Sequence, residues 1–212
     1  MLLLVPVAAG AQVVPVDRLV AVVEQRALMQ SDVELALRLG SVEPATPGGP
    51  SPVDQLVDRE LVRLEVDRFA VNEPPASAVD ERLAARAGAE PVAAWVHALT
   101  AYGVPADGIR RRVADDIRIE AYLEQRFGAA AQPTEVEVVE RARAEGAGVP
   151  VPRQALDAAR AALVRERRAR LVADWVDGLR RRAAVHVVVS PQAAIGRGEP
   201  EAQVPSSPER DA

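Results

Sequence analysis

The sequence contains no cysteine and no lysine, only two histidines, and few aromatic residues (3%). Without cysteine the chain has neither a disulfide framework nor a thiol nucleophile. Gly48-Gly49 lies between prolines and no lysine follows it, so there is no phosphate-binding loop of the usual type. His97 and His186 have no partner at metal-ligand spacing, so we expect no metal site and no cofactor. With few aromatics, the core must consist mostly of Leu, Val, Ile and Ala, which favours packed helices.

Catalytic patterns are also missing from the sequence. No Gly-x-Ser-x-Gly segment is present to place a serine nucleophile on a sharp turn. The adjacent carboxylates of Asp115 and Asp116 would point to different faces of a helix, which predicts a solvated helix flank instead of an acid–base pair. We therefore expect that the protein is not an enzyme.

The charges are mixed, with a formal net charge of −5. Arginine clusters occur at 110–112, 165–170 and 180–182, but acidic residues lie close to each of them. No aromatic residues alternate with these arginines to stack on bases. The pattern is typical of solvated helix faces with ion pairs, and it argues against nucleic acid as a partner.

The two ends of the chain differ in composition from its middle. Residues 2–8 are apolar and are followed by the small residues Ala9-Gly10-Ala11, which predicts an export signal over residues 1–11 with cleavage after Ala11. An N-terminal strand or a buried apolar tail is the alternative. The apolar run is too short for a membrane span, so we expect no stable membrane insertion. Residues 190–212 are rich in Pro, Gly and polar residues, which predicts a disordered tail.

Two short β-branched runs predict a small sheet. Leu19–Val23 is almost wholly apolar, as in a strand covered on both faces. Glu24-Gln25-Arg26 then predicts a turn, and Ser31 with Glu34 predicts a capping box that begins a helix. A lone strand cannot satisfy its backbone, and the other convincing strand is Val185–Val189. We expect these two strands to pair and to enclose a helical middle.

Apolar residues at helical spacing, bounded by Pro, Gly and capping residues, predict the helices of this middle. They are expected at about 52–70, 77–86, 91–102, 105–127, 133–146 and 154–182. The predicted fold over residues 12–189 is mainly α, with orthogonally packed helices and a two-stranded sheet of the N- and C-terminal strands. The last helix has an apolar stripe too long for one small core. Such helices can bind an extended apolar peptide in a cleft between them.

Four segments, in this order, resemble a known family. VDRLVAVVEQRALMQSDVELALRL (16–39) resembles the opening strand, turn and helix of SurA-type periplasmic chaperones. QLVDRELVRLEVDRFAV (55–71) is similar to the next helix of that family, and WVHALTAYGVPADGIRRRVADDIRIEAYLEQRF (95–127) to its helix–Gly–helix segment. QPTEVEVVERARAEG (132–146) resembles the helix that leads into the family's isomerase domain.

The resemblance implies the N-terminal chaperone core of this family, a periplasmic location, and ATP-independent holding of unfolded polypeptides, in particular outer-membrane protein precursors. Family members usually carry one or two parvulin-type prolyl isomerase domains before the last helix. Only Ala147–Arg153 stands in that place here, far fewer residues than a domain needs, so the resemblance does not imply isomerase activity.

Four aromatic residues are the candidate peptide contacts. They are Trp95, Tyr102, Tyr122 and Trp175. The alternative role for each is core packing, which buried aromatics commonly serve. Two alternative functions also stay open. One is a member of the isomerase family whose catalytic domain is degenerate or absent. The other is a helical adaptor whose last helix docks on a partner or on a second copy of the chain to form a homodimer.

Overall fold

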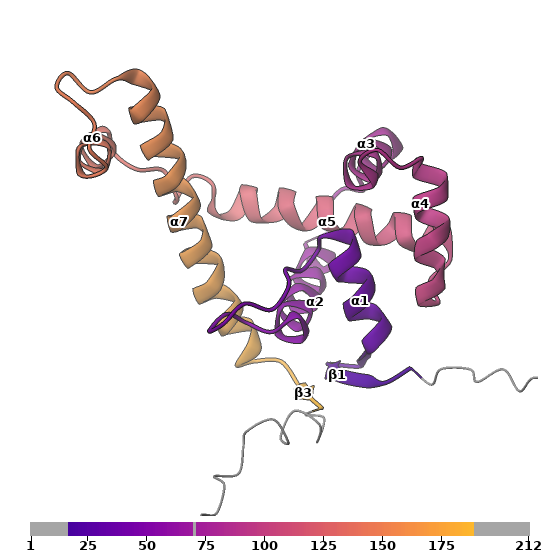
Figure 1. Cartoon of the computed structure of the whole chain (residues 1–212). Coiled ribbons are helices and arrows are strands. Elements are labelled where there is room, and N and C mark those ends of the chain that lie inside the picture. Colours follow the sequence, from indigo (N-terminus) through magenta and orange to yellow (C-terminus); the bar gives the residue numbers. More distant parts are fainter. Residues whose placement is uncertain (1–16, 70, 189–212) are drawn as a thin grey trace, which may run out of the picture.

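A computed structural model of the chain describes residues 17–69 and 71–188. The predicted mainly α fold with a small sheet is confirmed, and the helices run in different directions around the centrally placed α5 (Figure 1). In chain order the elements are β1 (Leu19–Val23), β2 (Arg26–Met29), α1 (Gln30–Leu39), α2 (Pro52–Arg68), α3 (Ala76–Ala87), α4 (Val92–Leu99), η1 (Thr100–Tyr102), α5 (Ala106–Phe127), α6 (Glu135–Ala144), α7 (Arg153–Arg180) and β3 (Val185–Val187). The predicted export signal at 1–11 and the predicted tail at 190–212 lie outside the described residues.

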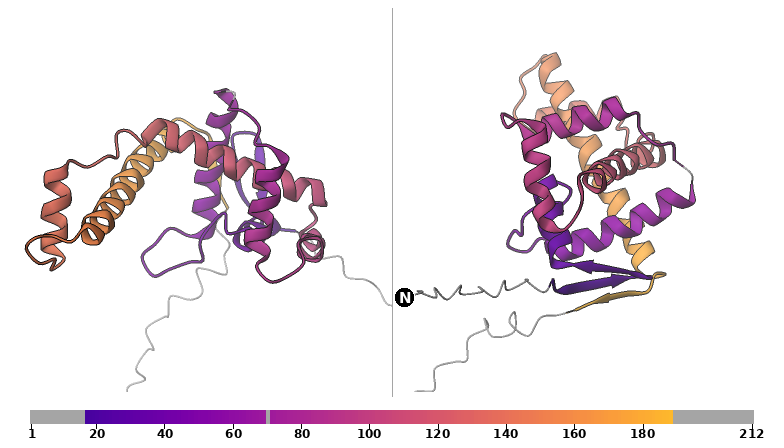
Figure 2. Two further views of the ribbon diagram at one scale, coloured as in Figure 1. Left: turned by 90° about the horizontal axis from the view of Figure 1, so that it is seen from above. Right: turned by 90° about the vertical axis from the view of Figure 1, so that its right-hand side faces the viewer.

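The first and last strands meet in the sheet, as the sequence predicts. β1 pairs antiparallel with β3, and Val22 lies opposite His186. The backbone N–H of Val188 donates to the carbonyl oxygen of Val20 at 2.9 Å, whereas Val189 lies outside the described residues. Figure 2 shows these strands side by side below the helices, so the sheet closes the helical middle.

The sheet has three strands, so the expectation of two strands is wrong. The chain turns back within two residues after β1, with Glu24 at a φ of 52°. β2 therefore begins at Arg26, inside the stretch that was predicted to be only a turn, and pairs antiparallel with β1. The strand order β2-β1-β3 places β1 in the centre, where Ala21 and Val23 are fully buried. The four residues of β2 are too few to show an alternating pattern.

Helix α1 starts two residues earlier than the predicted capping box allows, because its N-cap is Met29 and not Ser31. The carboxylate of Asp32 accepts the backbone N–H of Met29, the N-cap residue, at 2.9 Å. The predicted cap at Ser31 with Glu34 is therefore wrong. The backbone N–H of Ser31 donates to the carboxylate of Asp17 at 3.1 Å and its hydroxyl donates to the same group. The hydroxyl of Ser31 is thus engaged outside the helix, and these bonds lower the pKa of Asp17.

Helix α5 joins two apolar clusters. Its N-terminal half buries Ile109 and Val113 completely against α1, α3 and α4. Its C-terminal half buries Ile119 and Tyr122 in the cluster that includes the sheet, α2 and the C-terminal part of α7. Residues three or four apart share one side of a helix, so the predicted spacing is what directs these side chains inward.

Asp116 of α5 is buried, with an exposed fraction of 2%, and it joins four segments of the chain. It pairs with Arg59 of α2 and with Arg86 of α3, and its carboxylate accepts the hydroxyl of Ser41 at 2.7 Å. Burial lowers the pKa of Arg59 to about 10 and also lowers that of Arg86. The prediction of a solvated flank is therefore wrong for Asp116, although Asp115 is partly exposed and pairs with Arg118.

The helices α6 and α7 explain why the apolar stripe of the last helix is so long. The N-terminal part of α7 packs on α6 around Val138, Ala142 and Ala159, and the two form an arm that projects from the body (Figure 1). The C-terminal part of α7 packs on α2 and α5. Thr134 and Glu137 form a capping box at the start of α6, which confirms the predicted N-terminus. One helix therefore serves two cores.

Loss of the buried carboxylate should destabilise the whole fold. Asp116→Ala leaves two largely buried guanidinium groups without their shared partner, so we expect the free energy of unfolding to fall by about 3–5 kcal/mol. Asp107→Ala on the same helix is the matched control, because Asp107 and its partner Arg111 are both 75% exposed; its cost should stay below about 1 kcal/mol. Urea denaturation followed by circular dichroism measures both values, and equal losses would contradict this role of Asp116.

The arm should weaken in acid because of Glu137. Hydrogen bonds from the backbone and hydroxyl of Thr134, together with Arg167, lower the pKa of Glu137 to about 2 from its usual 4.5. Its stabilising effect should therefore be complete above pH 4.5 and be lost as the pH falls toward 2. The difference in unfolding free energy between wild type and Glu137→Gln should shrink over this range. Glu140→Gln is the control, because Glu140 has no side-chain hydrogen bond or ion pair among the described residues. A difference that does not change with pH would refute the prediction.

Candidate functional site

The four aromatic residues expected to contact a peptide lie in two separate places. Trp95 and Tyr102 are half-buried and pack against the cluster of α3, α4 and the start of α5. Tyr122 and Trp175 belong to the main cluster, where their ring centroids are 5.9 Å apart. The structure therefore brings the second pair together but not all four, and each of the four packs against a core.

Two phenylalanines extend the pair into a row of aromatic rings. The ring of Phe69 lies 5.6 Å from that of Tyr122, and the ring of Phe127 lies 5.6 Å from that of Trp175. The guanidinium of Arg126 stacks over Trp175 at 5.1 Å. Phe69 is 59% exposed, whereas Tyr122 is only 5% exposed. Both line a pocket of about 620 Å3, in which the exposed Phe69 is the aromatic surface that the sequence did not reveal.

A larger groove of about 760 Å3 lies where α2, α5 and α7 meet. Its apolar lining comes from Val62 of α2, Ile119 and Leu123 of α5, and Val172 and Val176 of α7. Helix α7 lines the groove with residues that recur every three or four positions, which places them along one side of the helix. These residues are Arg165, Arg168, Ala169, Val172, Ala173, Val176 and Asp177.

Charged side chains stand at the edges of this groove. Arg59 is already paired with the buried Asp116, and Asp58 pairs with Arg180. Burial raises the pKa of Asp58, and its pairing with Arg180 opposes that change. The groove thus has an apolar lining and a polar rim, and a mostly apolar lining with a few polar groups is the usual composition of a ligand-binding pocket.

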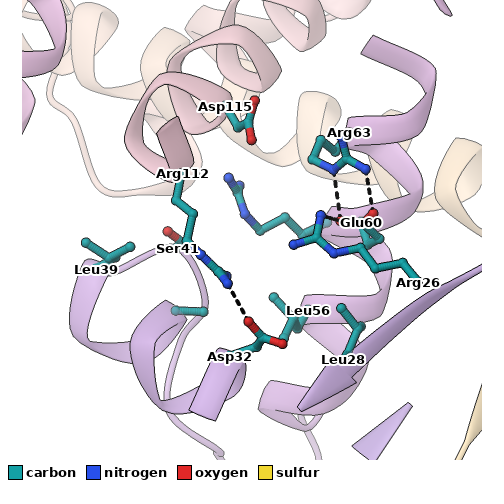
Figure 3. Close-up of a pocket in the computed structure, with 12 residues that line it drawn as sticks. Arg26, Leu28, Asp32, Leu39, Ser41, Leu56, Glu60, Arg63, Arg112 and Asp115 are labelled. Carbon is teal, nitrogen blue, oxygen red and sulfur yellow. Dashed lines mark hydrogen bonds and ion pairs between the residues drawn. The ribbon is translucent and has the colours of Figure 1, made fainter. Parts of the chain in front are cut away.

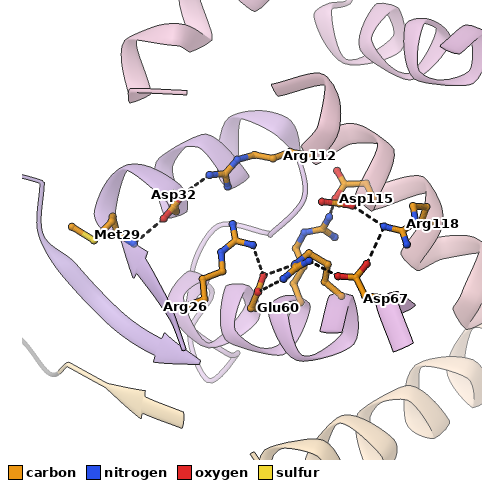
Figure 4. Close-up of polar contacts among 11 residues, drawn as sticks. Arg26, Met29, Asp32, Glu60, Asp67, Arg112, Asp115 and Arg118 are labelled. Atoms are coloured by element: carbon orange, nitrogen blue, oxygen red, sulfur yellow. Dashed lines mark hydrogen bonds and ion pairs between the residues drawn. The ribbon is translucent and has the colours of Figure 1, made fainter. Parts of the chain in front are cut away.

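A third cavity, which is polar, lies between α1, α2 and α5 (Figure 3) and measures about 40 Å3. Its charges are paired with each other: Glu60, only 5% exposed, accepts from Arg26 at 3.1 Å and from Arg63 at 2.7 Å. Arg112 pairs with Asp32 at the other side of the cavity (Figure 4). A cavity of this size holds a water molecule or two but no peptide side chain. The ion pairs around this cavity therefore connect the helices, and the cavity is too small to be a peptide site.

The residues that the structure describes show no group of His, Asp and Glu able to hold a metal ion. His97 and His186 are both exposed and come from different elements, α4 and β3. In residues 17–69 and 71–188 no helix is both long and apolar enough to cross a membrane.

Comparison with family models and with curated proteins finds no match for this sequence. The geometry of the groove is therefore the basis for the functional assignment.

The sequence pointed to the helices of the groove and to part of its apolar lining, because Leu123, Val172 and Val176 belong to the predicted apolar stripes, but it placed the peptide contacts elsewhere. None of the four predicted aromatic residues lines it. The long apolar stripe of α7 did indicate apolar surface beyond what one core needs. Ala169 and Ala173 also line the groove, and their small side chains leave space there. Alanine is common in helices because it favours them, so its presence alone does not predict a groove.

The burial of the aromatic row gives a test of which rings support the core. Tyr122→Ala should lower the free energy of unfolding by about 3–5 kcal/mol, because the ring is almost fully buried. Phe69→Ala, at the exposed ring that contacts it, should cost less than about 1 kcal/mol. Chemical denaturation of both variants measures the difference, and a smaller loss for Tyr122 than for Phe69 would be incompatible with this packing.

Proposed function

We propose that the protein is an ATP-independent periplasmic chaperone that holds unfolded polypeptides, with outer-membrane protein precursors as its clients. The single observation that carries the proposal is the open groove between α2, α5 and α7, with its apolar lining and polar rim. The resemblance of the sequence to SurA-type chaperones supports the client class and the periplasmic location.

The size and composition of the groove suit weak and reversible binding. Burial of one Val- or Leu-sized side chain contributes about 1.5–3 kcal/mol. Ordering each flexible side chain costs about 0.5–1.5 kcal/mol, and the loss of free motion of the client costs more. A groove that takes only a few apolar side chains is therefore expected to hold a client without trapping it, and it needs no ATP to release it.

The connection between the last two helices supports a chaperone without an isomerase domain. The loop 145–152 joins α6 to α7 at the tip of the arm, where the resembled family carries its parvulin domain. The proposal therefore contains no catalytic step. A proline-limited refolding assay checks this part, since acceleration by catalytic amounts of the protein would favour the isomerase alternative.

The groove can be blocked without removing any core side chain. Ala173 is exposed and lines the groove, so Ala173→Trp fills the space with an indole ring. Wild-type protein at several-fold molar excess should suppress the aggregation of an unfolded β-barrel protein without ATP, as measured by light scattering. We expect Ala173→Trp to require at least about a five-fold higher concentration for the same effect, a loss of about 1 kcal/mol in binding.

The matched control is Ala85→Trp, which places the same ring on an exposed alanine of α3 that lines none of the pockets described above. It should suppress aggregation as well as wild type does, and circular dichroism should show that both variants are folded. The proposal fails if the wild-type protein does not suppress aggregation, or if both variants behave alike.

A further inference from the structure

The two ends of the groove carry opposite net charge. We propose that the groove selects extended client segments with a short apolar centre, an acidic residue at one end and a basic residue at the other. This inference rests on the proposed function, because it describes the client segment that the same groove would hold.

The basic end is formed by Arg165 and Arg168 of α7, next to α5. Arg168 pairs with Glu124 at 2.8 Å and donates to the backbone carbonyl oxygen of Glu120 at 3.5 Å. Arg165 is exposed and has no ion pair or side-chain hydrogen bond among the described residues. One positive charge therefore remains at this end of the groove, available to a carboxylate of a bound segment.

The acidic end lies further along α7, beside α2. Asp54 and Asp58 lie beside the guanidinium of Arg180, which is 3.6 Å from Asp54 and pairs with Asp58. Asp177 lines the groove and has no ion pair among the described residues. Asp58 lines the groove together with Asp177, and the negative charges of Asp54 and Asp177 help burial to raise the pKa of Asp58. Negative charge therefore exceeds positive charge at this end.

The distance between the two ends sets the length of the segment. Arg165 and Asp177 are separated by twelve positions of one helix, or about 18 Å along its axis. An extended chain rises about 3.3 Å per residue, so about six residues span that distance. The side chains between the two ends are apolar or small, including Leu123, Val172 and Ala169. About four apolar residues between two charges therefore match the groove.

A set of four peptides tests this selectivity. Each is dye-labelled, has blocked termini and carries the same four-residue apolar centre, flanked by Glu and Arg, by Glu and Glu, by Arg and Arg, or by Gln and Gln. Fluorescence anisotropy at low salt should show that the Glu/Arg peptide binds about two- to five-fold more tightly than the Gln/Gln peptide. The Glu/Glu and Arg/Arg peptides should be attracted at one end of the groove and repelled at the other, so their affinities should lie below that of the Glu/Arg peptide. High salt should remove the differences.

Charge reversal at the two exposed positions should redirect the preference. Arg165→Glu makes both ends acidic, so the Arg/Arg peptide should become the tightest ligand. Asp177→Arg leaves Asp54 and Asp58 balanced by two guanidinium groups, so the acidic end becomes neutral. The Glu/Arg and Glu/Glu peptides should then bind about equally, each more tightly than the Arg/Arg peptide. Both side chains are exposed, and circular dichroism checks that each variant is folded.

The outcomes separate this inference from the proposed function. If all four peptides bind equally and Ala173→Trp weakens them all, the charge selectivity is wrong and the groove still binds polypeptide. If none of the peptides binds to the wild-type protein, the selectivity and the proposed function are both overturned. An unchanged preference in the two reversed variants would also overturn the selectivity.

Discussion

The buried carboxylate of Asp116 fixes the position of α5, and the rest of the structure depends on that helix. Charges are costly to remove from water, and a buried carboxylate is tolerated only with well-placed partners. Here Arg59 and Arg86 come from helices on different sides of α5, and Ser41 adds a hydroxyl from the loop after α1. These ionic contacts add to the close packing of the apolar side chains and fix one register of α5 against α2 and α3. The C-terminal half of α5 then packs beside α7 and defines the groove.

Most helices and the pairing of the two terminal strands could be predicted, because local sequence patterns determine them. The apolar spacing and the capping residues gave the helices, and two β-branched runs gave the pairing of β1 with β3. Features that depend on contacts between distant parts of the chain could not be predicted. β2 is four residues long and exists because the chain turns back after Glu24. The burial of Asp116 depends on arginines 57 and 30 positions away in the sequence. The groove depends on alanines of α7 that look no different from its other alanines.

The two pairs of predicted aromatic residues show the same limit. Residue type made Tyr122 and Trp175 candidates for peptide contacts or for core packing. Only the fold shows that their rings contact each other in the core. The open surface instead comes from aliphatic side chains with charges at their borders. Such a surface suits a holding function, because aliphatic contacts accept many sequences and the border charges restrict which segments fit.

The proposed function requires that an unfolded client lies in the groove between α2, α5 and α7. Because the chain has no cysteine of its own, a single introduced thiol reports on one position without ambiguity. The direct measurement is the rate of alkylation of Ala173→Cys in the groove and of Ala85→Cys on α3, each with and without an unfolded β-barrel protein. A client bound in the groove should slow alkylation several-fold at position 173 and leave the rate at position 85 unchanged. Equal protection at both positions, or none at position 173, would contradict the proposed function.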